Sequence, residues 1–87
     1  MINAKLPRAL LRWMYFKGEF RTHDVLQWGL NFKYNRADRQ KREFGAQGYI
    51  RELDKWEKVM RGYNTRESVY VANREKIKAE CNEILYT

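Results

Sequence analysis

The apolar residues of the N-terminal third recur at helical spacing and predict two short helices. We expect the first over about residues 4–16, ended by Gly18. A three-residue strand at 19–21 and a second helix over about 23–30 follow, and Gly29 suits the end of that helix. The apolar positions behind this prediction are Leu6, Leu10, Trp13 and Met14, then Val25, Leu26 and Trp28.

The segment from about residue 37 to 56 is helical in its apolar spacing but contains two glycines. Ile50 and Leu53 share one helix face, whereas Gly45 and Gly48 each weaken a helix interior by about 1 kcal/mol relative to alanine. Either the helix breaks near Gly45, or it continues and contacts the core on two sides. We favour a third helix that is continuous through Leu53.

From residue 57 the spacing of the apolar residues changes from helical to alternating. Residues 58–61 and 67–72 are rich in β-branched side chains at their centres, so we expect two strands joined by a loop at 62–66. Asn73 suits the cap of a last helix. Its apolar stripe consists of Ile77, Cys81, Ile84 and Leu85.

Positive charge is concentrated in particular segments of these 87 residues, whose formal net charge is +7. Residues 1–21 and residues 33–42 each contain five cationic side chains and one acidic side chain, whereas residues 73–87 are neutral. Such clustering is typical of a polyanion-binding surface, although basic residues that merely solvate exposed faces are the alternative. An apolar content of 44% supports a folded domain, which we expect to span 1–87.

The residues before and after the basic segment form a family-like pattern. Gly18-Glu19-Phe20 precede Thr22-His23-Asp24, Ile50 to Leu53 lead into Val59-Met60, and the hairpin contains Gly62 and Asn64. This order resembles the winged helix-turn-helix family of DNA-binding domains. The resemblance implies an α+β fold with three helices and a two- or three-stranded hairpin wing over residues 4–72, with a C-terminal helix appended over 73–87.

The resemblance also implies a binding surface, because the third helix of winged-helix proteins usually enters the major groove and the wing contacts backbone or minor groove. Arginine and glutamine pair with guanine and adenine edges, while lysine and asparagine suit phosphate. The candidate nucleic-acid-binding residues are Lys33, Asn35, Arg36, Arg39, Gln40, Lys41, Arg42, Arg61, Tyr63 and Arg66.

The aromatic residues and the last helix have two interpretations each. Phe32 and Tyr34 can stack on exposed bases, but we favour core packing, as we do for Trp13, Trp28 and Trp56. The last helix either packs within its own domain or pairs with a second copy, and the candidate dimerisation residues are Ile77, Cys81, Ile84 and Leu85.

No enzymatic constellation is evident. His23 is the single histidine and Cys81 the single cysteine, too few for a zinc site, and we expect no cofactor, metal or catalytic residue. Without a signal-peptide pattern or an apolar run long enough to span a bilayer, we expect a cytoplasmic protein. We therefore predict a double-stranded DNA-binding protein, in particular a small sequence-specific regulator of phage or plasmid type. A protein–protein module that blocks or adapts a nucleic-acid machine, or an RNA-binding protein, is the alternative.

Overall fold

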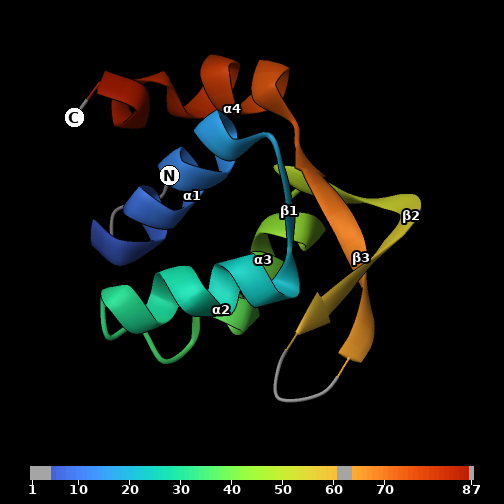
Figure 1. The fold of residues 1–87 in the computed structure, drawn as a ribbon. Coiled ribbons are helices and arrows are strands. Elements are labelled where there is room, and N and C mark those ends of the chain that lie inside the picture. The colour runs from blue at the N-terminus through green and yellow to red at the C-terminus, as the bar shows by residue number, and fades with distance from the viewer. Residues whose placement is uncertain (1–4, 61–63, 87) are drawn as a thin grey trace.

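The computed structural model describes residues 5–60 and 64–86 and has an α+β fold, as the sequence predicts. Four helices and three antiparallel strands make up this part of the chain, and the helices gather to one side of the hairpin formed by the last two strands (Figure 1). The elements follow the order α1 (Lys5–Lys17), β1 (Glu19–Arg21), α2 (Thr22–Asn31), α3 (Ala37–Ala46), β2 (Ile50–Met60), β3 (Asn64–Ala72), α4 (Arg74–Cys81) and the short 3₁₀ helix η1 (Asn82–Tyr86).

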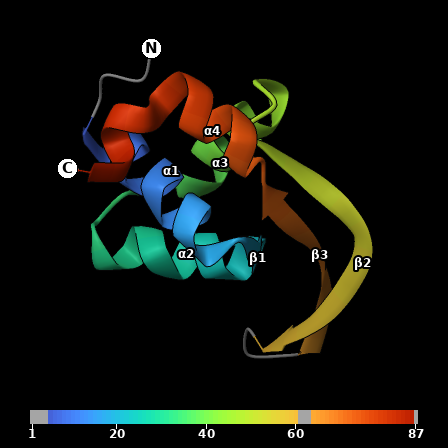
Figure 2. The same ribbon diagram turned by 90° about the horizontal axis from the view of Figure 1, so that it is seen from above.

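The three strands form one sheet in the order β1-β3-β2, so the short β1 pairs with the second strand of the hairpin. Phe20 lies opposite Tyr70 in that pairing. In the hairpin the register shifts between Glu52 and Trp56, and such an irregularity bends a strand and increases its twist. In Figure 2 β2 accordingly bows outward from the helices at its middle, and its far half turns back.

One apolar core lies between the helices and the base of the sheet. The buried side of α1 supplies Leu10, Leu11 and Met14, each fully inaccessible to solvent, and β1 supplies Phe20. The other buried members of this core are Val25, Trp28, Ala37, Phe44, Ile50, Ala72, Ile77, Cys81, Ile84 and Leu85. All eight elements thus contribute residues to one core, which makes the described chain a single packing unit.

The prediction of a continuous third helix is wrong, and the alternative of a break near Gly45 is correct. α3 ends at Ala46, and Gly48 adopts a positive φ of 84°, which a residue with a Cβ rarely tolerates. The amide of Tyr49 donates to the carbonyl of Phe44 at 3.0 Å and closes the turn. Residues 50–56 therefore belong to β2, where Ile50 pairs with Ala72.

The longer strands also correct the predicted hairpin and the environment of one tryptophan. β2 begins at Ile50 and β3 begins at Asn64, both earlier than predicted, so residues 64–66 lie in a strand and not in the loop. Trp56 is 60% exposed on β2 and does not belong to the core. By contrast, Trp28 is buried and Trp13 packs partly buried against the core, as predicted.

The last helix packs within its own domain. Ile77 and Cys81 of α4 and Ile84 and Leu85 of η1 are all buried in the core of the same chain. Of the two interpretations, packing within the domain is therefore the one observed, and these four side chains do not form an accessible dimerisation face. In the described part of the chain, no helix combines the length and apolar character needed to cross a bilayer.

Candidate nucleic-acid interface

α3 has one buried and one exposed side. Ala37, Lys41 and Phe44 recur at helical spacing and face the core, because each is nearly inaccessible to solvent. Arg39 and Arg42 lie on the opposite, exposed side. This division presents the arginines of α3 outward on a helix that is anchored over its whole length.

The turn between α2 and α3 depends on a glycine. The amides of Phe32 and Tyr34 both donate to the carbonyl of Gly29, at 3.1 and 2.7 Å, and Lys33 adopts a positive φ of 56°. A Cβ on Gly29 would lie 2.8 Å from both the Ala37 Cβ and the Tyr34 carbonyl oxygen, closer than real contacts allow. Gly29 therefore permits the tight approach that sets α3 against α2.

Polar side chains surround a shallow hollow of about 180 Å³ at the start of α3. The Tyr34 hydroxyl donates to the side-chain oxygen of Gln40 at 3.2 Å, which leaves the donor end of the Gln40 amide directed elsewhere. Burial, and secondarily the charge of Glu43, raise the pKa of Tyr34, so this phenol stays a hydrogen-bond donor at neutral pH. The hollow is lined by Tyr34, Arg36, Arg39, Gln40 and Glu43.

The exposed arginines of α3 form weak ion pairs within the helix. Arg39 Nε lies 3.7 Å from a Glu43 carboxylate oxygen, and Arg42 Nε lies 3.6 Å from a carboxylate oxygen of Asp38. Both pairs join residues four apart on the helix surface, and exposed pairs of this kind contribute only about 0.3–0.5 kcal/mol. A stronger anionic partner can therefore displace them at small cost.

Lys41 does not belong to the exposed cationic side, which corrects its predicted role as a phosphate contact. It is 4% exposed, its ammonium lies 4.0 Å from the centroid of the Tyr70 ring, and Asp38 lies 3.7 Å away. The reason is its position on the helix, four residues after Ala37 and three before Phe44. Its ammonium group therefore contacts a ring and a carboxylate of its own domain and is not presented to a ligand.

The other candidates of the 33–42 segment are accessible. Lys33, Asn35 and Arg36 are exposed in the turn that precedes α3. Phe32 is 52% exposed and packs over Trp28, with ring centroids 4.8 Å apart, so the prediction that it packs in the core is wrong. Tyr34 is partly buried, so the same prediction holds for it in part.

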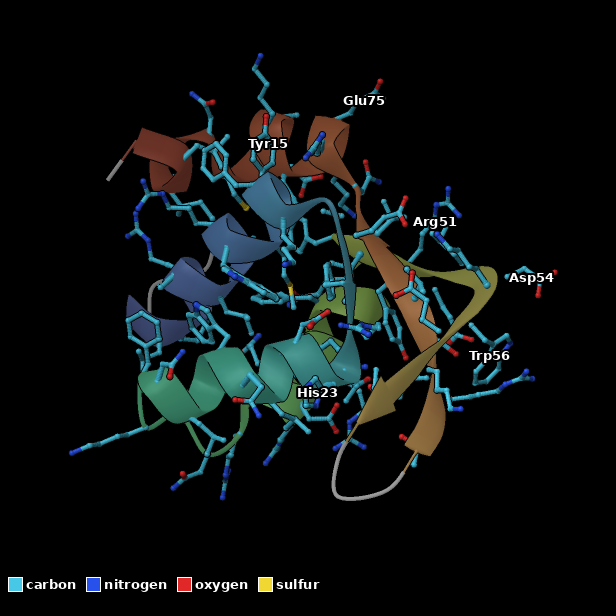
Figure 3. All side chains as sticks on the ribbon, viewed as in Figure 1. Tyr15, His23, Arg51, Asp54, Trp56 and Glu75 are labelled. Atoms are coloured by element: carbon cyan, nitrogen blue, oxygen red, sulfur yellow. The ribbon has the colours of Figure 1, made fainter. Side chains whose placement is uncertain are left out.

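The hairpin adds cationic side chains, although two of its predicted residues cannot be placed. Arg66 is exposed on β3 and lies directly opposite Lys58, also exposed, on β2. Arg61 and Tyr63 lie outside the described residues. Trp56 projects from the bend of β2 away from the body of the protein (Figure 3).

Sequence reasoning missed two cations that the strand presents. Arg51 is exposed near the start of β2 and, with Arg42, lines a hollow of about 410 Å³ between α3 and the hairpin. Lys58 was assigned to a strand but not to the interface. The two glycines after Phe44 were the signal that could have revealed Arg51, since a helix that ends there places residue 51 on a strand beside α3.

Among residues 5–60 and 64–86, no three His, Cys, Asp or Glu side chains lie together as metal ligands. Comparisons of the chain with models of protein families, with curated proteins and with solved structures find no match.

Proposed function

We propose that this protein binds double-stranded DNA through α3 and the β2–β3 hairpin, as a small sequence-specific regulator of winged helix-turn-helix type. The order of helices and strands, with a hairpin that follows α3 and a short β1 on its outer edge, supports the winged-helix assignment. In that arrangement α3 enters the major groove and the hairpin contacts the backbone or the minor groove.

The observation that carries the proposal is the exposed side of α3. Arg39 and Arg42 point outward from a helix whose other side is buried, and Arg36, just before α3, lines the same polar hollow as Arg39. An arginine can donate two parallel hydrogen bonds to guanine, and the amide of Gln40 suits adenine. A helix of this length anchored on one side supports such groups at fixed positions.

The mixture of charges favours base reading over a purely electrostatic contact. Glu43 lies beside the arginines, and a carboxylate is repelled by phosphate but accepts a hydrogen bond from the cytosine amino group. An acid beside Arg39 weakens the attraction to phosphate but can pair with a base edge. The arrangement therefore supports sequence-specific recognition.

The hairpin supports the proposal through a repulsive pair. Lys58 and Arg66 lie directly opposite each other, an arrangement that destabilises a sheet, and neither forms an ion pair with a described carboxylate. The next pair along, Glu57 and Glu67, also has like charges, but Arg21 lies close to both acids. An anion bound from outside the chain, such as phosphate, would relieve the uncompensated cationic pair.

The test is binding of the purified protein to a random duplex pool at two salt concentrations. We expect selection of a defined sequence, and an affinity that falls by orders of magnitude between about 50 and 200 mM salt if six or more phosphates are contacted. Substituting Arg39 and Arg42 together by alanine should abolish selection and leave thermal stability nearly unchanged.

The matched control is the double substitution of Arg12 and Lys78 by alanine, which removes the same charge from exposed positions of α1 and α4. This variant should retain the selected sequence and most of the affinity. Equal losses in both variants would indicate a general charge effect and not a site on α3. A shallow salt response with no selection would contradict DNA binding, and preference for structured RNA in direct competition would favour an RNA ligand.

A further inference from the structure

A second surface of the protein is apolar and unrelated to α3. A hollow of about 510 Å³ lies between α1 and the C-terminal end of α2, the end directed away from the hairpin in Figure 1. It shares no lining residue with the hollows beside α3. Its lining consists of Ala9, Arg12, Trp13, Phe16, Lys17, Trp28 and Phe32.

Aromatic rings form the floor and the walls of this hollow. Trp13 and Trp28 approach each other across α1 and α2, with ring centroids 6.4 Å apart, and form the floor. Phe16 and Phe32 stand on the two sides, 60% and 52% exposed. Large exposed apolar side chains gathered around one depression are typical of an interaction site.

The rim of the hollow is cationic. The guanidinium of Arg12 lies 5.9 Å from the centre of the Phe16 ring, and the ammonium of Lys17 lies 6.0 Å from the centre of the Trp13 ring. Both distances allow attraction between cation and ring, which keeps the charges beside the apolar floor. None of the described residues that line the hollow is acidic.

We propose that this α1–α2 hollow is a docking site for an acidic amphipathic helix of another protein. Such a helix would place aromatic or aliphatic side chains, spaced at i, i+3 or i+4 and i+7, between Phe16 and Phe32. Its flanking Asp and Glu side chains would pair with Arg12 and Lys17. The chemistry of the partner follows from the rim, because an apolar floor alone would not select an acidic segment.

Charge opposes a second copy of this chain as the occupant. Two copies that met through this hollow would bring both pairs of Arg12 and Lys17 together, on chains of formal charge +7 each. The neutral C-terminal segment of a second copy is not available to fill the hollow either, since its apolar stripe is buried in its own core.

The geometry of the rings also argues against single-stranded nucleic acid. Base stacking needs open ring faces along a cationic track. Here Trp28 already packs against both Trp13 and Phe32, and the rings surround one depression with a cation on either side. One or two anchoring side chains of a helix fit this shape better than a row of bases.

The test uses the full chain and a displayed library of helical peptides. Apolar positions are restricted to Leu, Phe and Trp, and the outward positions vary freely among Glu, Gln and Lys. We expect selection to enrich Glu over Lys. The affinity of the best peptide should fall about tenfold or more in Phe16→Ser, in Phe32→Ser and in the double charge reversal of Arg12 and Lys17 to glutamate.

Leu30→Ser is the matched control, because Leu30 is 70% exposed and apolar but does not line the hollow. Its affinity should equal that of the wild type. Thermal denaturation of each variant shows whether a loss of peptide affinity comes from a loss of folding stability. If Phe32→Ser is destabilised because its contact with Trp28 is lost, the affinity of the Phe16→Ser variant is the deciding measurement.

Three results would overturn the proposal. The first is the absence of acidic enrichment, and the second is a selected peptide that binds Phe16→Ser as tightly as the wild type. The third is a different occupant: displacement of the peptide by a single-stranded oligonucleotide, or concentration-dependent dimerisation in sedimentation that Phe16→Ser abolishes. DNA binding by the Phe16→Ser protein should be normal in every case, so the two surfaces are tested independently.

Discussion

The carboxylate of Glu67 in β3 accepts a hydrogen bond from the backbone amide of His23, at 2.8 Å, in the first turn of α2. The amides of a first helical turn have no partner within the helix, so a carboxylate there satisfies a donor and opposes the helix dipole. The bond joins residues 44 positions apart in the sequence and ties the hairpin to the start of α2 (His23 is labelled in Figure 3).

Replacing Glu67 by alanine should therefore lower the free energy of unfolding by about 1 kcal/mol, the usual effect of removing a helix N-cap. Glutamine retains an acceptor oxygen without the charge and should lose less. Urea denaturation measures both, with Glu83→Gln on the exposed surface of η1 as the control. If Glu67→Ala and Glu83→Gln denature at the same urea concentration, the bond contributes nothing to stability.

A second carboxylate at the start of α2 predicts a pH dependence. Burial alone would raise the pKa of Asp24, but hydrogen bonds from the Arg21 side chain and backbone outweigh it and hold the pKa below its ordinary value. A lowered folded-state pKa contributes stability that is complete above the unfolded-state pKa of about 3.9 and disappears as the pH falls through the lower, folded value.

The unfolding free energy of Asp24→Asn should thus be lower than that of the wild type at pH 6, and the difference should shrink as the pH falls below about 4. Denaturation at a series of pH values measures this. Asp54→Asn, in the exposed bend of β2, is the control. Curves for Asp24→Asn and wild type that stay parallel down to pH 2 would contradict the assigned interaction.

The elements determined by local signals could be predicted from the sequence. α1 ends where Gly18 takes a positive φ of 82°, and α4 begins where the Asn73 side chain accepts from the amide of Lys76 at 3.2 Å. Both effects depend on residues within four positions, so the sequence alone contains the information.

The elements that depend on distant partners were predicted less well. The spacing of Ile50 and Leu53 fits a helix, but Ile50 pairs with Ala72 and the segment is a strand. This pairing joins residues 22 positions apart, so it cannot be read from the local sequence. The exposure of Trp56 follows from the same strand. In the candidate interface, the sequence predicts a cationic segment over residues 33–42 but leaves open which of its cations are exposed. The contact of Lys41 with the ring of Tyr70 could not be predicted, because it joins α3 to a distant strand.

The buried position of Lys41 predicts that it supports the fold and does not contact DNA. Methionine has a similar length and no charge, so Lys41→Met should change the unfolding free energy by less than about 1.5 kcal/mol. Lys41→Glu would place a carboxylate near Asp38 and should cost more than about 2 kcal/mol. Duplex binding by Lys41→Met should match the wild type. A folded Lys41→Met protein that loses affinity as Arg39→Ala does would restore the phosphate-contact assignment.

Two glycines in or beside the interface should respond oppositely to alanine. Gly29→Ala would force its Cβ to 2.8 Å from Ala37 and from the Tyr34 carbonyl, which should cost about 1–3 kcal/mol and disturb the approach to α3. Gly45 is exposed in α3 with its nearest neighbour at an ordinary 3.9 Å, so Gly45→Ala should raise stability by about 0.5–1 kcal/mol. Thermal denaturation of the pair measures both signs, and a stabilised Gly29→Ala would show that the turn can relax.

The opposed cations of the hairpin should link stability to binding. Arg66→Glu places an acid across from Lys58, and replacing a like-charge pair by an opposite-charge pair should raise the free energy of unfolding by about 0.2–1 kcal/mol. The same change should weaken duplex binding and reduce its salt dependence, because a phosphate contact is lost. Lys78→Glu, on the exposed surface of α4, changes the net charge equally and serves as the control, with only a small loss of affinity expected. Denaturation and binding at two salt concentrations test both halves. If Arg66→Glu gains stability but binds duplex as Lys78→Glu does, the hairpin pair is repulsive without a role in DNA binding, and α3 alone would have to account for the interface.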